Sequence, residues 1–312
     1  MSPEASFPRV IIIVGPTGVG KTGLAIQLAR ALDGEVVSAD SRYLYRGMDI
    51  GTAKPTREEM AGVPHHMIDV AEPNETWSLA QYFENSKAVI QEILARGRTP
   101  IVVGGTGQYY RALTQGWTIP PAAPDDGLRD CLEQWGNEIG KWELHRKLAI
   151  IDPEAAGFIQ AENMRRTVRA LEVIFSTGRK FSEQRQATKS DLEFWTIGLI
   201  LPREVLFRKV DERIDRMFSQ GLVEEVKALQ TRGYGCHNPS MSAIGYQEVL
   251  QYLDGNISLN EAIMLMKSKT HQFIRRQANW FKTTDPQIHW YRVGDDHLPV
   301  ILKDLKKERD EE

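Results

Sequence analysis

The chain has 312 residues, of which 41% are hydrophobic and 26% charged, and its formal net charge is −3. This is the composition of an ordinary soluble protein with a substantial core, and no apolar run approaches the ~18 residues of a membrane span. The net charge argues against a uniformly basic nucleic-acid binder but leaves local basic patches open. The two cysteines, Cys131 and Cys236, lack metal-type spacing. They predict neither a disulfide framework nor a zinc site, so we expect a cytoplasmic protein without a membrane partner.

Residues 1–116 alternate short apolar runs with helical patterns. Strands are expected over 10–14, 35–38, 66–70 and 100–103, and a helix over 79–95. This alternation predicts a parallel sheet with helical crossovers. Parallel strands present their C-terminal ends to ligands. Three of these strands are followed by Gly15, Asp40 and Gly104-Gly105-Thr106, which indicates one shared crevice.

The first strand leads into a phosphate-binding loop with the sequence Gly15-Pro16-Thr17-Gly18-Val19-Gly20-Lys21-Thr22. The glycines let backbone N–H groups curl inward, and the following helix adds the positive end of its dipole. Lys21 would contact terminal phosphate oxygens, and the Thr22 hydroxyl suits a Mg²⁺ ion. A simple glycine turn between strand and helix would explain the glycines but not the Lys-Thr pair. The loop does not indicate which phosphates it binds.

The composition of the sequence changes from Trp117 onward. A Pro- and Asp-rich break over 120–127 precedes a stretch with few strand-like patterns. Helical spacing within this stretch predicts a mainly helical insertion over 117–194. The α/β core then resumes over 195–312, with strands over 194–201 and 288–293 and helices opening at Pro202 and covering 243–253 and 259–281. The expected fold is therefore a P-loop parallel sheet flanked by helices, with a helical insertion domain.

Asp40 follows the second expected strand and has several possible roles. In a simple kinase, an aspartate here would hold magnesium or orient a phosphate acceptor, and it would otherwise cap the next helix or turn. Position alone does not separate these roles. The stretch over 38–55 that contains Asp40 is, however, too polar and specific for a plain crossover helix.

This stretch resembles the tRNA dimethylallyltransferases, and the resemblance spans nearly the whole chain. The matching blocks are residues 15–22, 38–55, 103–107, 165–173, 243–246 and 270–282. Together and in this order, these blocks are much more specific to the family than the phosphate loop alone. Three positions depart from the family pattern: Tyr43, Gln247 and His271 stand where Gln, Lys and Arg are common. The departures affect the expected base contacts and RNA binding rather than the reaction class.

The resemblance implies transfer of a dimethylallyl group from dimethylallyl diphosphate to the N6 amine of the adenosine 3′ to the anticodon in tRNA. The loop would hold the leaving diphosphate, with Mg²⁺ on Thr22. Arg213 matches a second cationic clamp, although a solvated helix-face arginine is the ordinary interpretation. Asp40 matches the base that accepts the amine proton. Thr106 matches a residue near the reacting base, although a threonine after two glycines is more often a helix cap.

The expected tRNA-binding residues follow from the same blocks. They are Asp40, Ser41, Arg42, Tyr43, Thr106, Arg165, Arg166 and Arg169. A second basic segment contains Lys267, Lys269, Arg275, Arg276 and Lys282. Such runs are usually solvated helix faces, so their contact with RNA depends on the resemblance. We expect a monomer, and whether the loop also binds ATP stays open.

Three other functions remain compatible with parts of this pattern. A small-molecule phosphotransferase using ATP would share the loop, but the roughly 200 residues beyond the loop domain exceed what a minimal kinase needs. An isopentenyltransferase acting on free adenine nucleotide would share the catalytic blocks, and the arginine-rich insertion argues against it. A nucleotide-gated RNA-binding protein would bind RNA in an ATP-dependent way and form no product.

Overall fold

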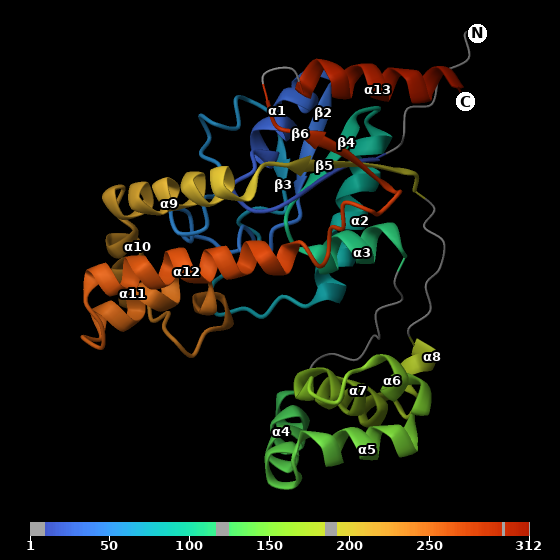
Figure 1. Cartoon of the computed structure of the whole chain (residues 1–312), viewed down its shortest axis with the longest axis vertical. Helices are drawn as coiled ribbons and strands as arrows, with labels where there is room; N and C mark the ends of the chain where they lie inside the picture. The colour runs from blue at the N-terminus through green and yellow to red at the C-terminus, as the bar shows by residue number, and fades with distance from the viewer. Residues whose placement is uncertain (1–9, 117–124, 185–191, 295–296, 312) are drawn as a thin grey trace. The chain divides into compact units, whose positions relative to one another are not determined.

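The computed structural model describes residues 10–116, 125–184, 192–294 and 297–311 (Figure 1). The chain forms two compact units, one containing Met1–Tyr110 and Asp191–Glu312 and the other containing Arg111–Ser190. The second unit corresponds to the insertion expected over 117–194, with bounds that differ by at most six residues. Within the described ranges, no helix is both long enough and apolar enough to cross a membrane.

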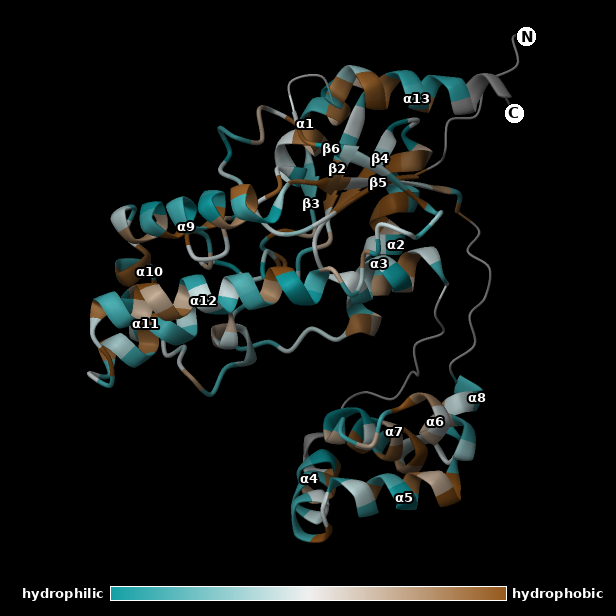
Figure 2. Cartoon of the chain, viewed as in Figure 1, coloured by the Kyte–Doolittle hydropathy of each residue, from teal (hydrophilic) through white to brown (hydrophobic). Residues whose placement is uncertain are grey.

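A parallel sheet of six strands in the order β3-β2-β4-β1-β5-β6 forms the centre of the first unit. The strands are β1 (Val10–Val14), β2 (Gly34–Ser38), β3 (His65–His66), β4 (Thr99–Val103), β5 (Phe194–Ile200) and β6 (Ile288–Arg292). All five residues of β1 are buried, as a continuous apolar run in the middle of a parallel sheet should be. In Figure 2, brown ribbon gathers in the middle of the sheet around β5, which marks the hydrophobic core. The expected parallel α/β fold is thus confirmed.

Helices cover this sheet and extend beyond its edge. They are α1 (Lys21–Ala31), α2 (Leu79–Ala95), α3 (Gly107–Thr114), α9 (Arg203–Ser219), α10 (Leu222–Thr231), α11 (Tyr246–Leu253), α12 (Leu259–Gln277) and α13 (His297–Glu311), with a 3₁₀ turn at Pro239–Ser242. α1, α2 and α13 pack against strands, whereas α9 to α12 pack on one another. Figure 1 shows α9 and α12 running side by side. These helices bring residues far along the chain to the ligand edge of the sheet.

The strand expected over 66–70 is the clearest error in the predicted fold, because β3 ends at His66. Met67 and Asp69 have φ angles of 59° and 55°, and residues in this left-handed region interrupt strand pairing. The Asp69 carboxylate instead forms an ion pair of 2.6 Å with Lys54. This interaction gives the apolar-looking run a different local structure.

Other differences concern helix limits. The helix expected over 243–253 begins only at Tyr246, since Gly245 has φ 99°, and the helix expected over 259–281 ends at Gln277. The sequence analysis did not identify α10 as a separate helix. Gly221, with φ 102°, separates it from α9.

The second unit is helical, as expected. It contains α4 (Asp126–Ile139), α5 (Lys141–Ile151), α6 (Pro153–Phe158), α7 (Met164–Thr177) and α8 (Phe181–Gln184). Its own core includes Leu132, Leu148 and Leu171. The buried Asp152 carboxylate accepts hydrogen bonds from the Ser182 backbone and hydroxyl, both at 2.8 Å, and so attaches α8 to the start of α6.

Candidate active site

A cavity of about 320 Å³ lies at the C-terminal edge of the sheet within the first unit. It is lined by Thr17, Lys21, Asp40, Ser41, Arg42, Gly51, Thr52, Gly105, Thr106, Arg213, Ile214, Met217, Ser242, Ala243, Ile244, Met266, Thr270, Phe273, Arg276 and Gln277. The expected convergence of three strand ends on one crevice is therefore observed. α9 and α12 supply the opposite wall, which adds apolar groups to a floor of polar and charged ones.

The loop over 15–22 has the geometry expected of a phosphate cradle. Gly20 is the N-cap of α1 with φ 104°, and no side chain caps the helix there. Amides at an uncapped helix start carry partial positive charge and can bind an anion. Gly18 approaches α9 so closely that a Cβ would lie 2.6 Å from a Val210 methyl group. This contact holds the loop against the helix that carries Arg213.

Two cations meet at this cradle. The Lys21 ammonium donates to the Pro16 carbonyl at 2.9 Å, and the Arg213 guanidinium donates to the Thr17 hydroxyl at 3.2 Å. Burial lowers the pKa of Lys21 to about 8; Asp40 opposes this shift and Arg213 adds to it. Burial also lowers the pKa of Arg213. The Arg213 Nε atom is buried, and no partner is described for it. An anion in the cavity would satisfy both cations.

Asp40 lines the same cavity just after the end of β2, and its neighbours fix its position. Its carboxylate accepts the backbone N–H of Arg42 at 2.9 Å, in a local turn. The Ser41 backbone N–H points to the Thr106 hydroxyl at 3.4 Å, which links the end of β2 to the segment after β4. Gly104 permits this approach, because a Cβ there would lie 2.1 Å from the Ala39 carbonyl oxygen. Asp40, Ser41 and Thr106 therefore form one polar corner.

Arg42 lines the cavity and also holds a neighbouring segment of the cavity wall in place. Its guanidinium donates to the carbonyls of Pro239 and Ser240, at 3.3 and 3.2 Å, and to the Ser242 hydroxyl at 3.4 Å. These bonds hold the 3₁₀ turn whose following residues, Ala243 and Ile244, line the cavity. Three intramolecular bonds occupy much of the guanidinium, so its first role in this structure is positioning.

Tyr43 and Thr22 do not belong to the described cavity lining. The Tyr43 hydroxyl donates to the Ala53 carbonyl at 2.7 Å and accepts a bond from Thr22. Burial raises the pKa of Tyr43 above its ordinary value, and the nearby Asp40 charge adds to this. The structure thus brings Tyr43 to the phosphate loop, not to an exposed surface where a base would stack.

The same contacts decide how a magnesium ion would fit. A hydroxyl oxygen that donates its proton to a neighbour keeps lone pairs for a metal, so the interaction of Thr22 with Tyr43 is compatible with a metal on Thr22. Within the described ranges, no cluster of three or more His, Cys, Asp or Glu side chains is arranged to hold a metal. Mg²⁺ commonly uses one or two protein ligands together with substrate phosphates. The residues present suit such a shared ion and not a cage made of protein alone.

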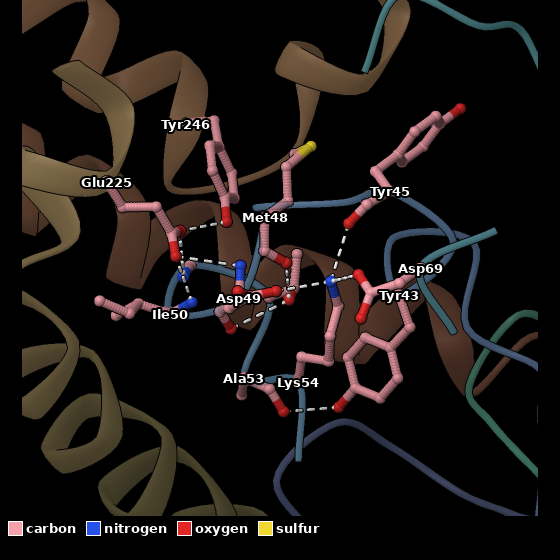
Figure 3. A network of polar contacts seen from close by, with 12 residues as sticks. Tyr43, Tyr45, Met48, Asp49, Ile50, Ala53, Lys54, Asp69, Glu225 and Tyr246 are labelled. Atoms are coloured by element: carbon pink, nitrogen blue, oxygen red, sulfur yellow. Dashed lines mark hydrogen bonds and ion pairs between the residues drawn. The ribbon is translucent and has the colours of Figure 1, made fainter. Parts of the chain in front are cut away.

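The polar stretch over 42–55 is held by a buried lysine that the sequence analysis did not single out (Figure 3). The Lys54 ammonium donates to the Tyr45 carbonyl at 2.7 Å and pairs with Asp49 and Asp69 at 2.6 Å each. Its side chain is only 4% exposed. A buried ammonium with three oxygen partners is a strong local constraint on the loop.

Glu225 on α10 holds the next part of the same loop. Its carboxylate accepts the backbone N–H groups of Asp49, Ile50 and Gly51 at 3.0, 2.7 and 3.2 Å, and Tyr246 donates its hydroxyl to it (Figure 3). Gly51 lines the cavity. No local sequence signal marked Glu225, because the backbone N–H groups that it binds lie about 175 positions away.

The predicted tRNA-binding arginines of the insertion have two different environments. Arg165 and Arg166 are exposed in the first turn of α7. Arg169 forms a 3.0 Å ion pair with Glu172, which is fully buried and also pairs with Arg129 at 3.0 Å. Burial opposes ionisation of Glu172, but the bonds from both arginines hold its pKa below the usual value. Arg169 thus stabilises the second unit, whereas Arg165 and Arg166 present their charges to solvent.

The basic residues of α12 are similarly divided. Lys267 pairs with Asp215 at 2.7 Å and Lys269 with Glu248 at 2.6 Å, whereas Arg276 lines the cavity. The three departures from the family pattern all have intramolecular partners. Besides Tyr43, Gln247 accepts from Lys269 at 3.1 Å, and His271 contacts Asp211 at 2.9 Å.

Comparison with known proteins agrees with this arrangement. The sequence model of the IPP transferase family matches residues 43–284. A tRNA dimethylallyltransferase from Thermomicrobium roseum is 49% identical over 284 residues, covering 91% of this chain and 86% of the relative. One from a Roseiflexus species is 50% identical over 273 residues, covering 88% and 90%.

Solved structures show the same likeness in three dimensions. The crystal structure of a tRNA isopentenylpyrophosphate transferase from Bacillus halodurans is 40% identical, with a TM-score of 0.73 and coverage of 97% of each chain. A eukaryotic dimethylallyltransferase acting on tRNA is 30% identical with a TM-score of 0.80, covering 96% of this chain and 80% of that one.

Proposed function

This chain belongs to the IPP transferase family, and on that premise we propose that it prenylates tRNA. It transfers the dimethylallyl group of dimethylallyl diphosphate to N6 of the adenosine 3′ to the anticodon and releases diphosphate. The observation that carries the proposal is the cavity itself, which Lys21, Arg213 and Asp40 line together. An anion site and a general base thus share one cavity.

The cations act on the leaving group. As the carbon–oxygen bond of dimethylallyl diphosphate breaks, negative charge grows on the diphosphate. The α1 amides, Lys21 and Arg213 stabilise that charge more strongly in the transition state than in the ground state, which lowers the barrier. Mg²⁺ held by the Thr22 hydroxyl and the diphosphate oxygens would neutralise further charge there.

Asp40 acts on the acceptor. The lone pair of the exocyclic adenine amine is delocalised into the ring, so attack benefits from removal of a proton. As the new carbon–nitrogen bond forms, the amine proton passes to the Asp40 carboxylate. Thr106, which is joined to the Asp40 turn through Ser41, would contact the same base. The adenosine must leave its stack to reach the cavity.

Arg165 and Arg166 contact phosphates of the tRNA. Cations in the first turn of a helix oppose the helix dipole, so Arg165 and Arg166 do not serve to stabilise α7. Exposed arginines suit reversible phosphate contacts, since they release condensed counterions on binding. Arg169 contributes mainly by holding α7 in shape. The protein acts as a monomer in the cytoplasm, where its tRNA substrate is found.

One assay tests the proposal. The protein is incubated with Mg²⁺, radiolabelled dimethylallyl diphosphate and either unmodified tRNA or AMP, and ATP hydrolysis is followed in parallel. We expect label in tRNA only, at N6 of the adenosine 3′ to the anticodon. Label in AMP alone, or ATP hydrolysis without any labelled product, would contradict the proposal.

A further inference from the structure

A buried side-chain amide joins the two halves of the active site. Gln277 is the last residue of α12 and is 3% exposed. Its Oε1 atom accepts the backbone N–H of Thr17 at 2.9 Å, and its Nε2 atom donates to the backbone carbonyl of Gly105 at 3.0 Å. The two bonds cross 260 and 172 positions of sequence. The amide therefore bridges two loops that are otherwise distant along the chain.

The space around the amide is shaped for this bridge. A Cβ atom at Gly105 would lie 2.2 Å from the Gln277 Nε2 atom, so any larger residue would displace it. The backbone of Gly105 does not adopt a positive φ. The close approach of Gln277, and not backbone conformation, is thus what requires glycine at position 105.

The two loops serve different substrates under the proposed function. Thr17 belongs to the phosphate cradle, and its hydroxyl accepts from Arg213. Gly105 precedes Thr106, which is linked to the Asp40 turn. The bridge thus connects the side that holds the leaving diphosphate to the side that meets the adenine amine. It also occupies the Thr17 N–H, which is then not free to bind phosphate.

We propose that Gln277 is a positioning residue that fixes the separation between the phosphate loop and the 104–106 segment. This inference rests on the proposed function, because it assigns Gln277 a role in aligning the two reacting partners. A misplacement of about 1 Å between such partners can reduce the rate about 10²-fold. A side-chain amide fits both sides, since its carbonyl oxygen accepts and its NH2 group donates within one plane.

Substitutions with little change of shape test this role. Gln277→Glu keeps the size but replaces the donor with an oxygen facing the Gly105 carbonyl, and Gln277→Met removes both bonds. We expect kcat at saturating substrates to fall about 10- to 100-fold, while the KM values for tRNA and dimethylallyl diphosphate change less than about threefold. Gln230→Glu, the same change at an exposed position of α10, is the matched control and should stay within about twofold of the original rate.

A double-mutant cycle tests the bridge from its other end. Gly105→Ala should lower kcat in the original chain by pushing the amide away. It should cost little more when Gln277→Ala has already removed that amide, because the clash is then absent. Equal costs of Gly105→Ala in both backgrounds would show that the two residues are not coupled and would overturn the inference. Because this comparison uses Gln277→Ala, it still decides the matter if Gln277→Glu or Gln277→Met unfolds.

The outcomes separate the inference from the proposed function. If the original chain does not prenylate tRNA, the proposed function fails. If it does, and a folded Gln277→Glu variant retains kcat within about twofold while its unfolding temperature falls, Gln277 has a structural role only and the inference is wrong. Loss of kcat with a preserved unfolding transition and preserved KM values supports it.

Discussion

The cations of the two units differ in how they are held. Lys21 and Arg213 lie in a cavity, each with a hydrogen bond to the phosphate loop. Arg165 and Arg166 are exposed on the first turn of a helix. Charges removed from water act strongly and at fixed positions, whereas exposed charges are screened within about 10 Å at ordinary salt. The first pair therefore suits bond breaking, and the second suits reversible RNA binding.

This contrast predicts that cavity variants lose rate and insertion variants lose affinity. The largest effect is expected for Asp40→Asn, which keeps the shape but removes the proton acceptor. We expect kcat to fall about 10²- to 10⁴-fold, with tRNA affinity near normal. Single-turnover rates and filter-binding affinities measure the two quantities. Asp33→Asn, at an exposed position after α1, is the control. Turnover of Asp40→Asn within about threefold of the original would remove Asp40 from the mechanism.

Arg213→Gln is expected to have the next largest effect. Loss of a buried cation facing the diphosphate should lower kcat/KM for dimethylallyl diphosphate about 10²-fold. Arg216→Gln, at an exposed position of the same helix, should change it less than about twofold. Steady-state kinetics with saturating tRNA distinguish the two. Equal effects of both substitutions would mean that general charge, and not the position of Arg213, is what matters.

The double variant Arg165→Gln/Arg166→Gln should act on tRNA alone. We expect tRNA affinity to fall about tenfold and the slope of log affinity against log salt to become shallower by about 1.5. kcat at saturating tRNA should stay unchanged, and Arg146→Gln, exposed elsewhere in the insertion, is the control. A lower kcat with an unaltered salt slope would contradict the prediction that Arg165 and Arg166 act on tRNA affinity and not on turnover.

The smallest predicted effect concerns pH. The pKa of Lys21 is lowered to about 8, so its ammonium is charged at pH 7 and loses its proton as pH rises through 8. Since diphosphate binds the charged form, KM for dimethylallyl diphosphate should rise about fourfold between pH 7 and 8.5. Lys21→Arg should flatten this pH dependence, because arginine stays charged. A KM that is independent of pH in the original chain would contradict the assignment.

Short sequence motifs predicted those parts of the site that are formed by residues close together in the chain. The loop over 15–22, the strand ends at Asp40 and Gly104, and the parallel sheet all follow from short motifs and periodicity. Arg213 was placed only through the family resemblance, because a helix-face arginine has no signal of its own. The structure brings it to Thr17.

The residues that hold the site in position through long-range hydrogen bonds could not be predicted in the same way. Glu225 and Gln277 act through partners 170 or more positions away, so their roles depend on the packing of α10 and α12. The strand expected over 66–70 failed for a related reason. Its apolar pattern carried no sign that Asp69 would turn toward the buried Lys54.

Under the proposed function, the phosphate loop binds the leaving diphosphate of the prenyl donor. The most direct test is a nucleotide-free reaction in which diphosphate release and dimethylallyl incorporation into tRNA are measured together. We expect one diphosphate for each dimethylallyl group, with no ATP required and with added diphosphate inhibiting competitively against the donor. Transfer that depends on ATP, or ATP hydrolysed in proportion to product, would contradict it.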